Sequence, residues 1–255
     1  MRRRLFAAVL LAVLAATGLT ACSGSSDPDV LRVGTEGTYA PFSFQGTDGA
    51  LTGYDVEIAR AVGEKLGKRV EFVQTPWDAI FAGLESRRFD VVANQVTVTP
   101  ERSRKYGIST PYTVSEGVVV TRADDNSITS LADLRGKTSA QSVTSNWNQV
   151  ATDAGAKVEA VEGFVQAVQL LKNGRVDATV NDNLAVAEYT TRTGDSGVKV
   201  AAETGSTTEQ AFATRKDDAL LADLNRALDE LRADGTLKRI SEKYFGTDVS
   251  APAGN

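Results

Sequence analysis

The arginine at position 102 stands where a side chain could bind a carboxylate. It follows Thr99, Pro100 and Glu101, which predict a helix start because they offer a hydroxyl cap, a proline for the first turn and an early acid. The free N–H groups and positive dipole end of such a turn favour an anion. A guanidinium adds two parallel charge-assisted hydrogen bonds, which fix the orientation of the bound carboxylate. The alternative is a solvent-exposed arginine near a helix start, and the pattern by itself leaves both interpretations open.

The residue inventory excludes several kinds of catalytic and metal site. The chain has no histidine and a single cysteine, Cys22. Serine–histidine catalysis, cysteine–histidine catalysis and histidine-ligated zinc are therefore excluded, which leaves only carboxylate, lysine, tyrosine or serine–lysine chemistry for an enzyme. We expect no metal and no cofactor, and the inventory favours a binding protein over a catalyst.

The net charge argues against a nucleic-acid partner. The chain carries 28 basic and 33 acidic residues, a formal net charge of −5 that would become −8 on loss of the three arginines near its start. An acidic protein repels a phosphate backbone, so we expect no nucleic acid among its partners.

Residues 1–21 have the order of an export signal. Arg2–Arg4 give a positive start, residues 5–19 are apolar, and small residues precede Cys22. The apolar run is too short to span a bilayer comfortably, so we expect cleavage. The run from Leu19 to Cys22 resembles the bacterial lipobox, in which the thiol is diacylated and becomes the mature amino terminus; the alternative is a chance thiol. Two acyl chains would anchor the exported protein to the outer face of the cytoplasmic membrane without spanning it.

Short β-branched runs alternate with helical patterns, which is typical of a layered α/β fold. From Trp77 onward, for example, apolar residues recur at i+3, i+4 and i+7, the stripe of an amphipathic helix. Strands are expected at 31–34, 42–44, 51–54, 70–73, 90–98, 117–122, 137–140, 158–161, 176–180 and 210–214. Helices are expected at 55–66, from 77, from 99, near 131, from 145, from about 164, after 183, at 217–232 and at 237–244.

The alternating pattern restarts after the strand at 117–122, which predicts two α/β lobes. We expect lobe 1 from residues 30–118 and 212–247 and lobe 2 from residues 119–211, joined by two extended segments that can act as a hinge. Residues 22–29 are small and polar, as in a flexible spacer behind a lipid anchor. Residues 248–255 predict a flexible tail.

Several short motifs occur in a fixed order. They are Glu36-Gly37-Thr38-Tyr39-Ala40-Pro41-Phe42-Ser43-Phe44, Gly53-Tyr54-Asp55-Val56, Trp77-Asp78-Ala79-Ile80, the run from Asp90 to Arg102, and the run from Gly174 to Asp182. From about Leu31 to Thr247 the chain resembles the polar amino-acid branch of the bacterial extracellular solute-binding proteins, the receptors of ABC importers. The resemblance implies an α/β, two-lobed periplasmic-binding-protein-like fold of type II, in which two hinge strands join the lobes and an amino acid is held between them.

The resemblance assigns both charges of that amino acid to named residues. Arg102 binds the α-carboxylate, with further donors from Thr97 and the backbone around Gln95. Asp182 matches the carboxylate that accepts hydrogen bonds from the α-ammonium group, and Glu36 assists it. One arginine and one aspartate on facing lobes fit a zwitterion. Without the resemblance, Thr97 is an ordinary strand residue and Asp182 a turn or helix cap.

The resemblance also assigns the walls of the cleft. Ser145 and Asn146 begin a helix of lobe 2 and face the same carboxylate, although a purely local capping role also fits Ser145. Tyr39 and Trp77 match aromatic positions that enclose the ligand side chain. Trp77 also begins an apolar helical stripe, which fits a core position.

The ligand is predicted from the amides and hydroxyls around these positions. The runs 94–97, 139–142 and 144–146 resemble those of cystine-binding members. They fit an uncharged, extended polar ligand, whereas a cationic or anionic one would need further charged groups. We therefore predict cystine, followed by glutamine or another polar amino acid, captured by a monomer that delivers it to an ABC permease. The alternatives are an enzyme on the same scaffold that dehydrates prephenate-like acids with a cleft carboxyl group, and a sensor that does not feed a transporter.

Overall fold

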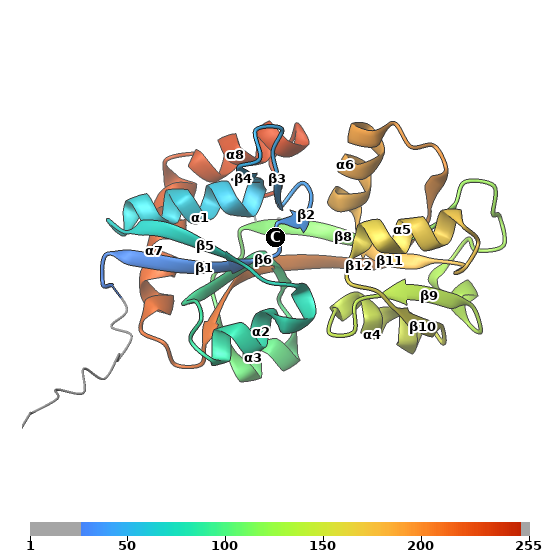
Figure 1. Ribbon diagram of the computed structural model, residues 1–255, viewed down its shortest axis with the longest axis horizontal. Coiled ribbons are helices and arrows are strands. Elements are labelled where there is room, and N and C mark those ends of the chain that lie inside the picture. The colour runs from blue at the N-terminus through green and yellow to red at the C-terminus, as the bar shows by residue number, and fades with distance from the viewer. Residues whose placement is uncertain (1–26, 251–255) are drawn as a thin grey trace, which may run out of the picture.

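The computed structural model describes residues 27–250 and contains two lobes joined by long strands (Figure 1). The export signal predicted at 1–21, the lipid anchor predicted at Cys22 and residues 251–255 lie outside the described residues. Within the described part of the chain, every helix is too short or too polar to cross a membrane.

Each lobe is a sheet covered by helices. Lobe 1 contains β1 (Val30–Thr35), β2 (Thr38–Tyr39), β3 (Ser43–Gln45), β4 (Leu51–Thr52), α1 (Tyr54–Lys65), β5 (Arg69–Gln74), α2 (Trp77–Glu85), β6 (Val91–Thr97), α3 (Pro100–Lys105), β7 (Tyr106–Ile108), α7 (Leu220–Ala233) and α8 (Thr236–Phe245). Lobe 2 contains η1 (Leu131–Leu134), β9 (Thr138–Gln141), α4 (Asn146–Asp153), β10 (Lys157–Ala160), α5 (Phe164–Lys172), β11 (Thr179–Asp182) and α6 (Asn183–Thr193). The strands β8 (Thr113–Arg122) and β12 (Val198–Arg215) run between the lobes.

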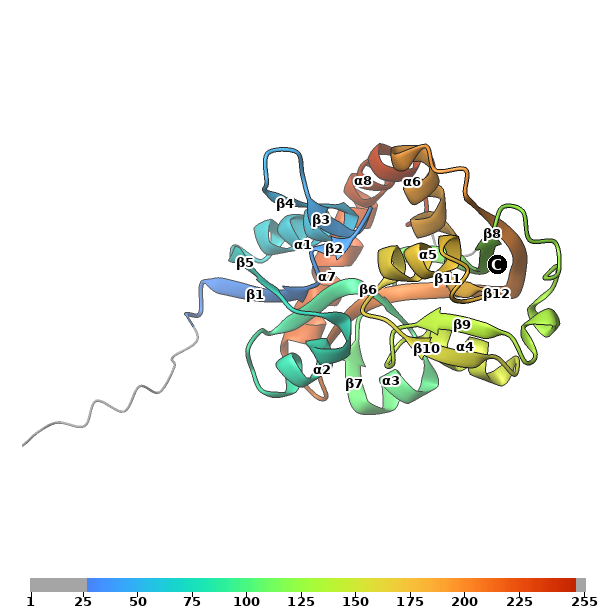
Figure 2. The ribbon, with the colours of Figure 1, turned by 45° about the vertical axis from the view of Figure 1, so that its right-hand side comes forward.

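The two crossing strands join strands of both lobes in one hydrogen-bonded sheet, with the strand order β11-β8-β12-β6-β1-β5, while β9 and β10 in lobe 2 and β2, β3 and β4 in lobe 1 form separate small sheets. In lobe 1, β5, β1 and β6 are parallel neighbours. Antiparallel β12 pairs with β6 on one side and with β8 on the other. Figure 2 shows β12 running from one lobe into the other. Two adjacent antiparallel strands can bend together, which suits a hinge.

Separate apolar cores support the division into lobes. Apart from Ala185, the buried members of two hydrophobic clusters come from residues 31–112 and 212–240, whereas the buried members of two others come from residues 118–198. A body with its own core can move as a unit, so the cleft between the lobes is the place where the molecule can open.

The crossing strands are longer than the sequence pattern predicts. The expected strand at 210–214 is the end of β12, which begins at Val198, because the polar residues and the bulge between Glu203 and Thr207 hide the strand periodicity. Similarly, β8 begins at Thr113 instead of residue 117. Val118 and Val120 belong to a lobe 2 core, so the chain leaves lobe 1 a few residues before the expected boundary at 118.

The first residues of the tail expected from residue 248 are packed against lobe 1. Val249 packs on the lobe 1 core, and its carbonyl accepts a hydrogen bond from the Val114 backbone N–H at 2.8 Å. Ser250 is also buried. Residues 248–250 are therefore part of the folded body, because an apolar side chain and a strand edge hold them where composition alone suggested a loose end.

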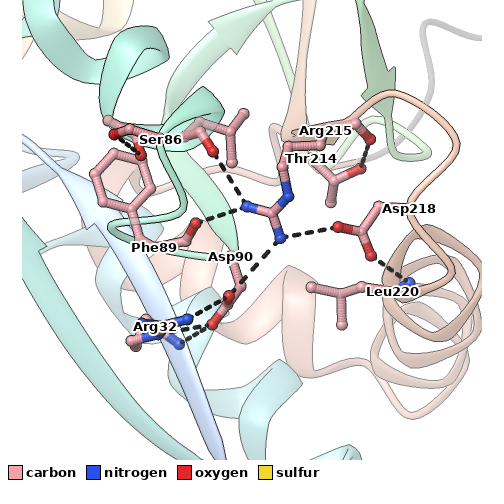
Figure 3. Close-up of polar contacts among 10 residues, drawn as sticks. Arg32, Ser86, Phe89, Asp90, Thr214, Arg215, Asp218 and Leu220 are labelled. Carbon is pink, nitrogen blue, oxygen red and sulfur yellow. Dashed lines mark hydrogen bonds and ion pairs between the residues drawn. The ribbon is translucent and has the colours of Figure 1, made fainter. Parts of the chain in front are cut away.

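The far end of β12 is fastened into lobe 1 by a cluster of charged side chains (Figure 3). The Arg215 guanidinium donates to the carbonyl oxygens of Leu84 and Phe89 at 3.2 and 2.9 Å, and it pairs with Asp218 at 2.9 Å. It also lies 3.8 Å from Asp90, whose carboxylate pairs with Arg32 of β1 at 2.9 Å. One arginine thus joins β12 to the turn before β6, which gives the hinge a fixed end.

We predict that Arg215→Ala lowers the free energy of unfolding by about 2–3 kcal/mol, because two carbonyl groups and two partly buried carboxylates lose their shared donor. Urea unfolding followed by circular dichroism measures this. The control is Arg226→Ala on α7, whose exposed pair with Asp223 should contribute less than about 0.5 kcal/mol. Equal effects of the two substitutions would contradict the role given to Arg215.

Candidate functional site

The cleft between the lobes contains two adjoining cavities that share Ser145, Asn146 and Trp147. The first cavity lies against Glu36, Tyr39 and other residues at the carboxyl ends of strands from both lobes, the usual place for a ligand in an α/β sheet. The second extends past Arg102. A ligand that enters this cleft meets side chains from both lobes.

Arg102 is buried at the start of α3, and none of the ion pairs between residues 27 and 250 includes it. Its backbone N–H is capped by the Thr99 hydroxyl at 3.1 Å, as the sequence predicts. Its guanidinium donates to the Thr97 carbonyl oxygen at 2.9 Å and to the Thr144 carbonyl oxygen of lobe 2 at 3.4 Å. The guanidinium carbon lies over the Trp77 ring, 5.1 Å from its centre. Aromatic and carbonyl neighbours hold the cation in place but leave its full charge uncompensated.

The electrostatic state of Arg102 follows from this burial. Desolvation lowers the pKa of the guanidinium to about 10, and the nearby Glu101 charge only partly opposes the shift. The group is still protonated at neutral pH. Among the described residues, no carboxylate oxygen lies within 4 Å of it. A buried cation with unused donors is a site for an external anion.

The strand β6, which leads to Arg102, contains a bulge that the Asp55 side chain fixes in place. Between Val92 and Val96, β6 advances four residues while β12 advances two, and Gln95 takes a left-handed φ of 48°. The fully buried Asp55 carboxylate accepts both the backbone N–H and the side-chain Nε2 of Gln95, each at 2.7 Å. The Gln95 backbone N–H was predicted to donate to a ligand, but it already donates to Asp55. Gln95 nevertheless lines the first cavity. Thr97, at the end of the strand, lines the second cavity with Arg102.

Glu36 forms one wall of the first cavity. Its Oε2 accepts from the Asn94 Nδ2 at 2.6 Å, and its backbone N–H donates to the Asn94 Oδ1 at 2.8 Å. Burial raises the pKa of the carboxyl group to about 7, and the charge of Asp78 adds to the shift, while Asn94 and the Trp77 backbone oppose it. Near neutral pH, Glu36 can therefore either accept a hydrogen bond or donate one.

The two predicted aromatic residues lie on the wall of the first cavity. The Tyr39 hydroxyl donates to the Asn181 Oδ1 at 2.7 Å, a bond that joins lobe 1 to lobe 2. Trp77 serves in both of the roles that the sequence suggests. It belongs to a lobe 1 hydrophobic cluster, and its ring also faces Arg102. Its indole Nε1 is buried without a protein partner.

Ser145 and Asn146 stand where the two cavities meet. The Ser145 hydroxyl accepts from the Trp147 backbone N–H at 3.1 Å, so the local capping role is present. The hydroxyl keeps a proton to donate, which leaves room for a second role toward a ligand. Asn146 is half-buried in the first turn of α4.

Asp182 lies beneath the cleft and does not line either cavity. Its Oδ1 caps α6 by accepting from the Leu184 backbone N–H at 2.9 Å, and its Oδ2 accepts from the Ser115 hydroxyl of β8. Burial raises the pKa of this carboxyl group to about 6. The preceding residue, Asn181, lines the first cavity in its place. Neighbouring residues of a strand point to opposite faces, which explains why only one of them faces the cavity.

Eight of the predicted ligand-binding residues therefore line one or both cavities, and Asp182 stands behind them. Sequence reasoning did not assign a site role to Phe164, Trp147 or Asn181, and it placed Asn94 and Gln141 only within runs that resemble cystine-binding members; all five line the first cavity. For Trp147 and Asn181 the only signal was a neighbour that the resemblance did name. Within residues 27–250, no group of three or more metal-ligating side chains is close enough to hold a metal ion.

The sequence of this chain matches the bacterial extracellular solute-binding proteins, family 3, over residues 31–247. The chain belongs to this family. The predicted family and the two-lobed type II fold are thus confirmed. Among curated relatives, this solute-binding protein is 52% identical to a probable amino-acid ABC transporter-binding protein of Haemophilus influenzae over 86% of each chain. It is 51% identical to the L-cystine-binding protein TcyA of Bacillus subtilis, over 96% of this chain and 97% of TcyA.

Two solved structures differ in how closely they match the lobe arrangement of this solute-binding protein. An ancestral arginine-binding protein bound to arginine is 41% identical and superposes with a TM-score of 0.80, covering 86% of this chain and 99% of its own. The L-cystine solute receptor of Neisseria gonorrhoeae in its unliganded open conformation is more similar in sequence, at 46%, but has a TM-score of 0.59 over 88% of this chain and 95% of its own. The lobes here are arranged more like those of the arginine-bound protein.

We predict that the free energy of unfolding of this solute-binding protein falls as the pH rises from 5 to 8. Burial raises the pKa of Asp55 to about 7, so the folded state holds a proton that the unfolded state releases near pH 4. The stabilisation is complete below pH 4 and is lost as the pH rises toward 7. We expect Asp55 to account for about 2 kcal/mol of the loss in urea titrations across this range, since one pKa unit corresponds to about 1.4 kcal/mol.

Asp55→Asn should make this decline shallower by about 2 kcal/mol, because one titrating group is gone while Glu36 and Asp182, whose pKa values burial also raises, remain. The control is Asp133→Asn on the surface, where hydrogen bonds lower the pKa, so that the group is already ionised above pH 5. A decline as steep in Asp55→Asn as in the wild type would contradict the assignment.

Proposed function

We propose that this protein is the substrate-binding component of an ABC importer and captures a polar amino acid, with L-cystine as the first candidate. The observation that carries the proposal is the buried Arg102 guanidinium, which has unused donors and, within residues 27–250, forms no ion pair with an acid. A carboxylate bound there would restore the charge balance that the protein leaves open. Every free amino acid carries such a carboxylate.

In this proposal the two charges of the ligand are bound by different lobes. The α-carboxylate lies against Arg102 and the Thr97 hydroxyl of lobe 1, with Ser145 and Asn146 of lobe 2 closing over it. The α-ammonium group is attracted by the charge of Asp182, which stands behind Asn181 on the wall of the first cavity. Because the two halves of the site meet only when the lobes close, binding energy favours the closed form.

L-Cystine is preferred because it is long, uncharged overall and polar at both ends. The second amino-acid end of L-cystine has one positive and one negative charge that cancel, so it needs hydrogen-bonding groups rather than a further charged side chain. The first cavity offers Glu36, Asn94, Gln141 and Asn181 for this purpose. The name of TcyA and that of the gonococcal receptor support the same choice. In the full proposal a monomer, held by lipid at Cys22 on the outer face of the cytoplasmic membrane, carries the ligand to its permease.

The proposed function is tested by a thermal-shift panel of the twenty amino acids with L-cystine, followed by calorimetry. A ligand that binds only the folded state raises the melting temperature, so L-cystine should give the largest shift. The panel would reject L-cystine if another amino acid binds more tightly, and it would reject amino-acid capture if none binds.

We predict that Arg102→Ala weakens L-cystine binding at least about 100-fold, because the ligand carboxylate would lie desolvated without its cation. Arg102→Lys should recover only part of the loss, since an ammonium group cannot form the two parallel bonds. Calorimetry measures both, with Arg226→Ala as the control that leaves affinity unchanged. Wild-type affinity in Arg102→Ala would reject the proposed site.

We also predict that affinity rises as the pH rises through 6. Burial raises the pKa of Asp182 to about 6, so the group is mostly protonated at pH 5 and cannot pair with an ammonium ion. Binding at pH 5 should therefore be about tenfold weaker than at pH 7 and should release protons. Asp182→Asn should remove this component, while Glu36→Gln tests the separate contribution of the carboxyl group whose pKa is about 7.

A cleft enzyme is the second candidate, favoured by one observation. The Glu36 carboxyl group, with a pKa near neutrality, could act as a general acid. A related structure, 34% identical with a TM-score of 0.77, is an ancestral amino-acid-binding protein that is a precursor of cyclohexadienyl dehydratase. Formation of product from a prephenate-like acid would favour the enzyme.

A third candidate is a sensor that binds the amino acid but does not feed a transporter. Unchanged amino-acid uptake in a deletion strain would favour it.

A further inference from the structure

Asp78 belongs to the Trp77-Asp78-Ala79-Ile80 motif, but the proposed site does not use it. It is an exposed residue in the first turn of α2, on the lobe 1 side of the cleft. Its carboxylate reaches across to lobe 2 and accepts three hydrogen bonds from two consecutive residues. The donors are the Thr144 backbone N–H at 2.9 Å, the Thr144 hydroxyl at 2.7 Å and the Val143 backbone N–H at 3.3 Å.

These donors belong to the loop 142–145, which leads into α4 and brings Ser145 and Asn146 to the cleft. The loop has little apolar burial to hold it, since Val143 at its tip is 59% exposed. Within lobe 2 it is fixed by polar contacts, such as the Asn148 Nδ2 donating to the Val143 carbonyl oxygen at 3.1 Å. Its place relative to lobe 1 therefore depends strongly on the carboxylate of Asp78.

The same loop touches the proposed carboxylate site. The Thr144 carbonyl oxygen accepts from the Arg102 guanidinium at 3.4 Å, so one residue is bonded to Asp78 on one side and to Arg102 on the other. Fixing Thr144 thus sets the distance between the guanidinium and the start of α4. Asp78 itself lines neither cavity, so it would act without touching a ligand.

We propose that Asp78 is a positioning residue, which fastens the loop 142–145 to lobe 1 and favours the closed cleft. Its bonds join different lobes and exist only when the lobes are together, so their free energy adds to that of the closed form. The proposal rests on the proposed function in one respect, that a ligand binds inside this cleft. The consequence is slower ligand release and a more compact protein, both controlled from outside the binding site.

The test uses Asp78→Ala, Thr144→Val and the double variant, each checked by circular dichroism for folding. With L-cystine as the probe, stopped-flow dissociation should be about tenfold faster in Asp78→Ala, which loses all three bonds to a charged acceptor. It should be about threefold faster in Thr144→Val, which loses the hydroxyl bond alone. The double variant should equal Asp78→Ala, because the hydroxyl has no partner once the carboxylate is gone.

A second measurement does not depend on any ligand. Small-angle X-ray scattering of the free protein should give a larger radius of gyration for Asp78→Ala than for the wild type. The control is Asp223→Ala, which removes an exposed acid from the first turn of α7, far from the cleft, and should change neither quantity. A failure of L-cystine to bind the wild type, together with the expansion of Asp78→Ala, would reject the ligand and keep the role of Asp78. The proposed role of Asp78 would be overturned if Asp78→Ala had the dissociation rate and radius of gyration of the wild type. It would also be overturned if the rate effects of the two substitutions multiplied in the double variant.

Discussion

The burial of an arginine without an acid is the constraint on which the cleft depends. Arg102 lies between the Trp77 ring and the carbonyl oxygen of Thr97, and its pKa is lowered to about 10 because water has been removed without a countercharge. Carbonyl oxygens and aromatic faces stabilise such a cation only in part. The described part of the folded protein therefore leaves this buried cation without an ion pair, an arrangement that favours an anion in the cleft.

The support for this arginine comes from deeper in lobe 1. The Asp55 carboxylate holds Gln95 in a left-handed conformation, which a glutamine adopts only when its surroundings impose it. The resulting bulge in β6 turns the strand just before Thr97. A buried acid with a raised pKa thus contributes to geometry rather than to the binding charge, at some loss of stability at neutral pH.

The two lobes depend on each other through a small number of polar contacts. The bond from Tyr39 to Asn181 and the bonds from Thr144 to Asp78 join surfaces whose apolar cores are separate. Such contacts are individually weak and exchange readily with water. Opening the cleft would break these polar contacts and would also move Tyr39, which packs against cores of both lobes, whereas the sheet formed by β8 and β12 keeps the halves together.

The sequence by itself determined the family, the α/β class, the two lobes and the local ends of helices. The Thr99 cap beside Arg102 and the Ser145 cap of α4 could be predicted because capping depends on residues two or three positions apart. Tertiary structure alone decided which neighbours face the cavity, such as Asn181 in front of Asp182. It also decided that Asp55 meets Gln95, 40 residues away. Such pairs arise from strand register and lobe approach, which are set by packing of the whole chain and leave no local periodicity in the sequence.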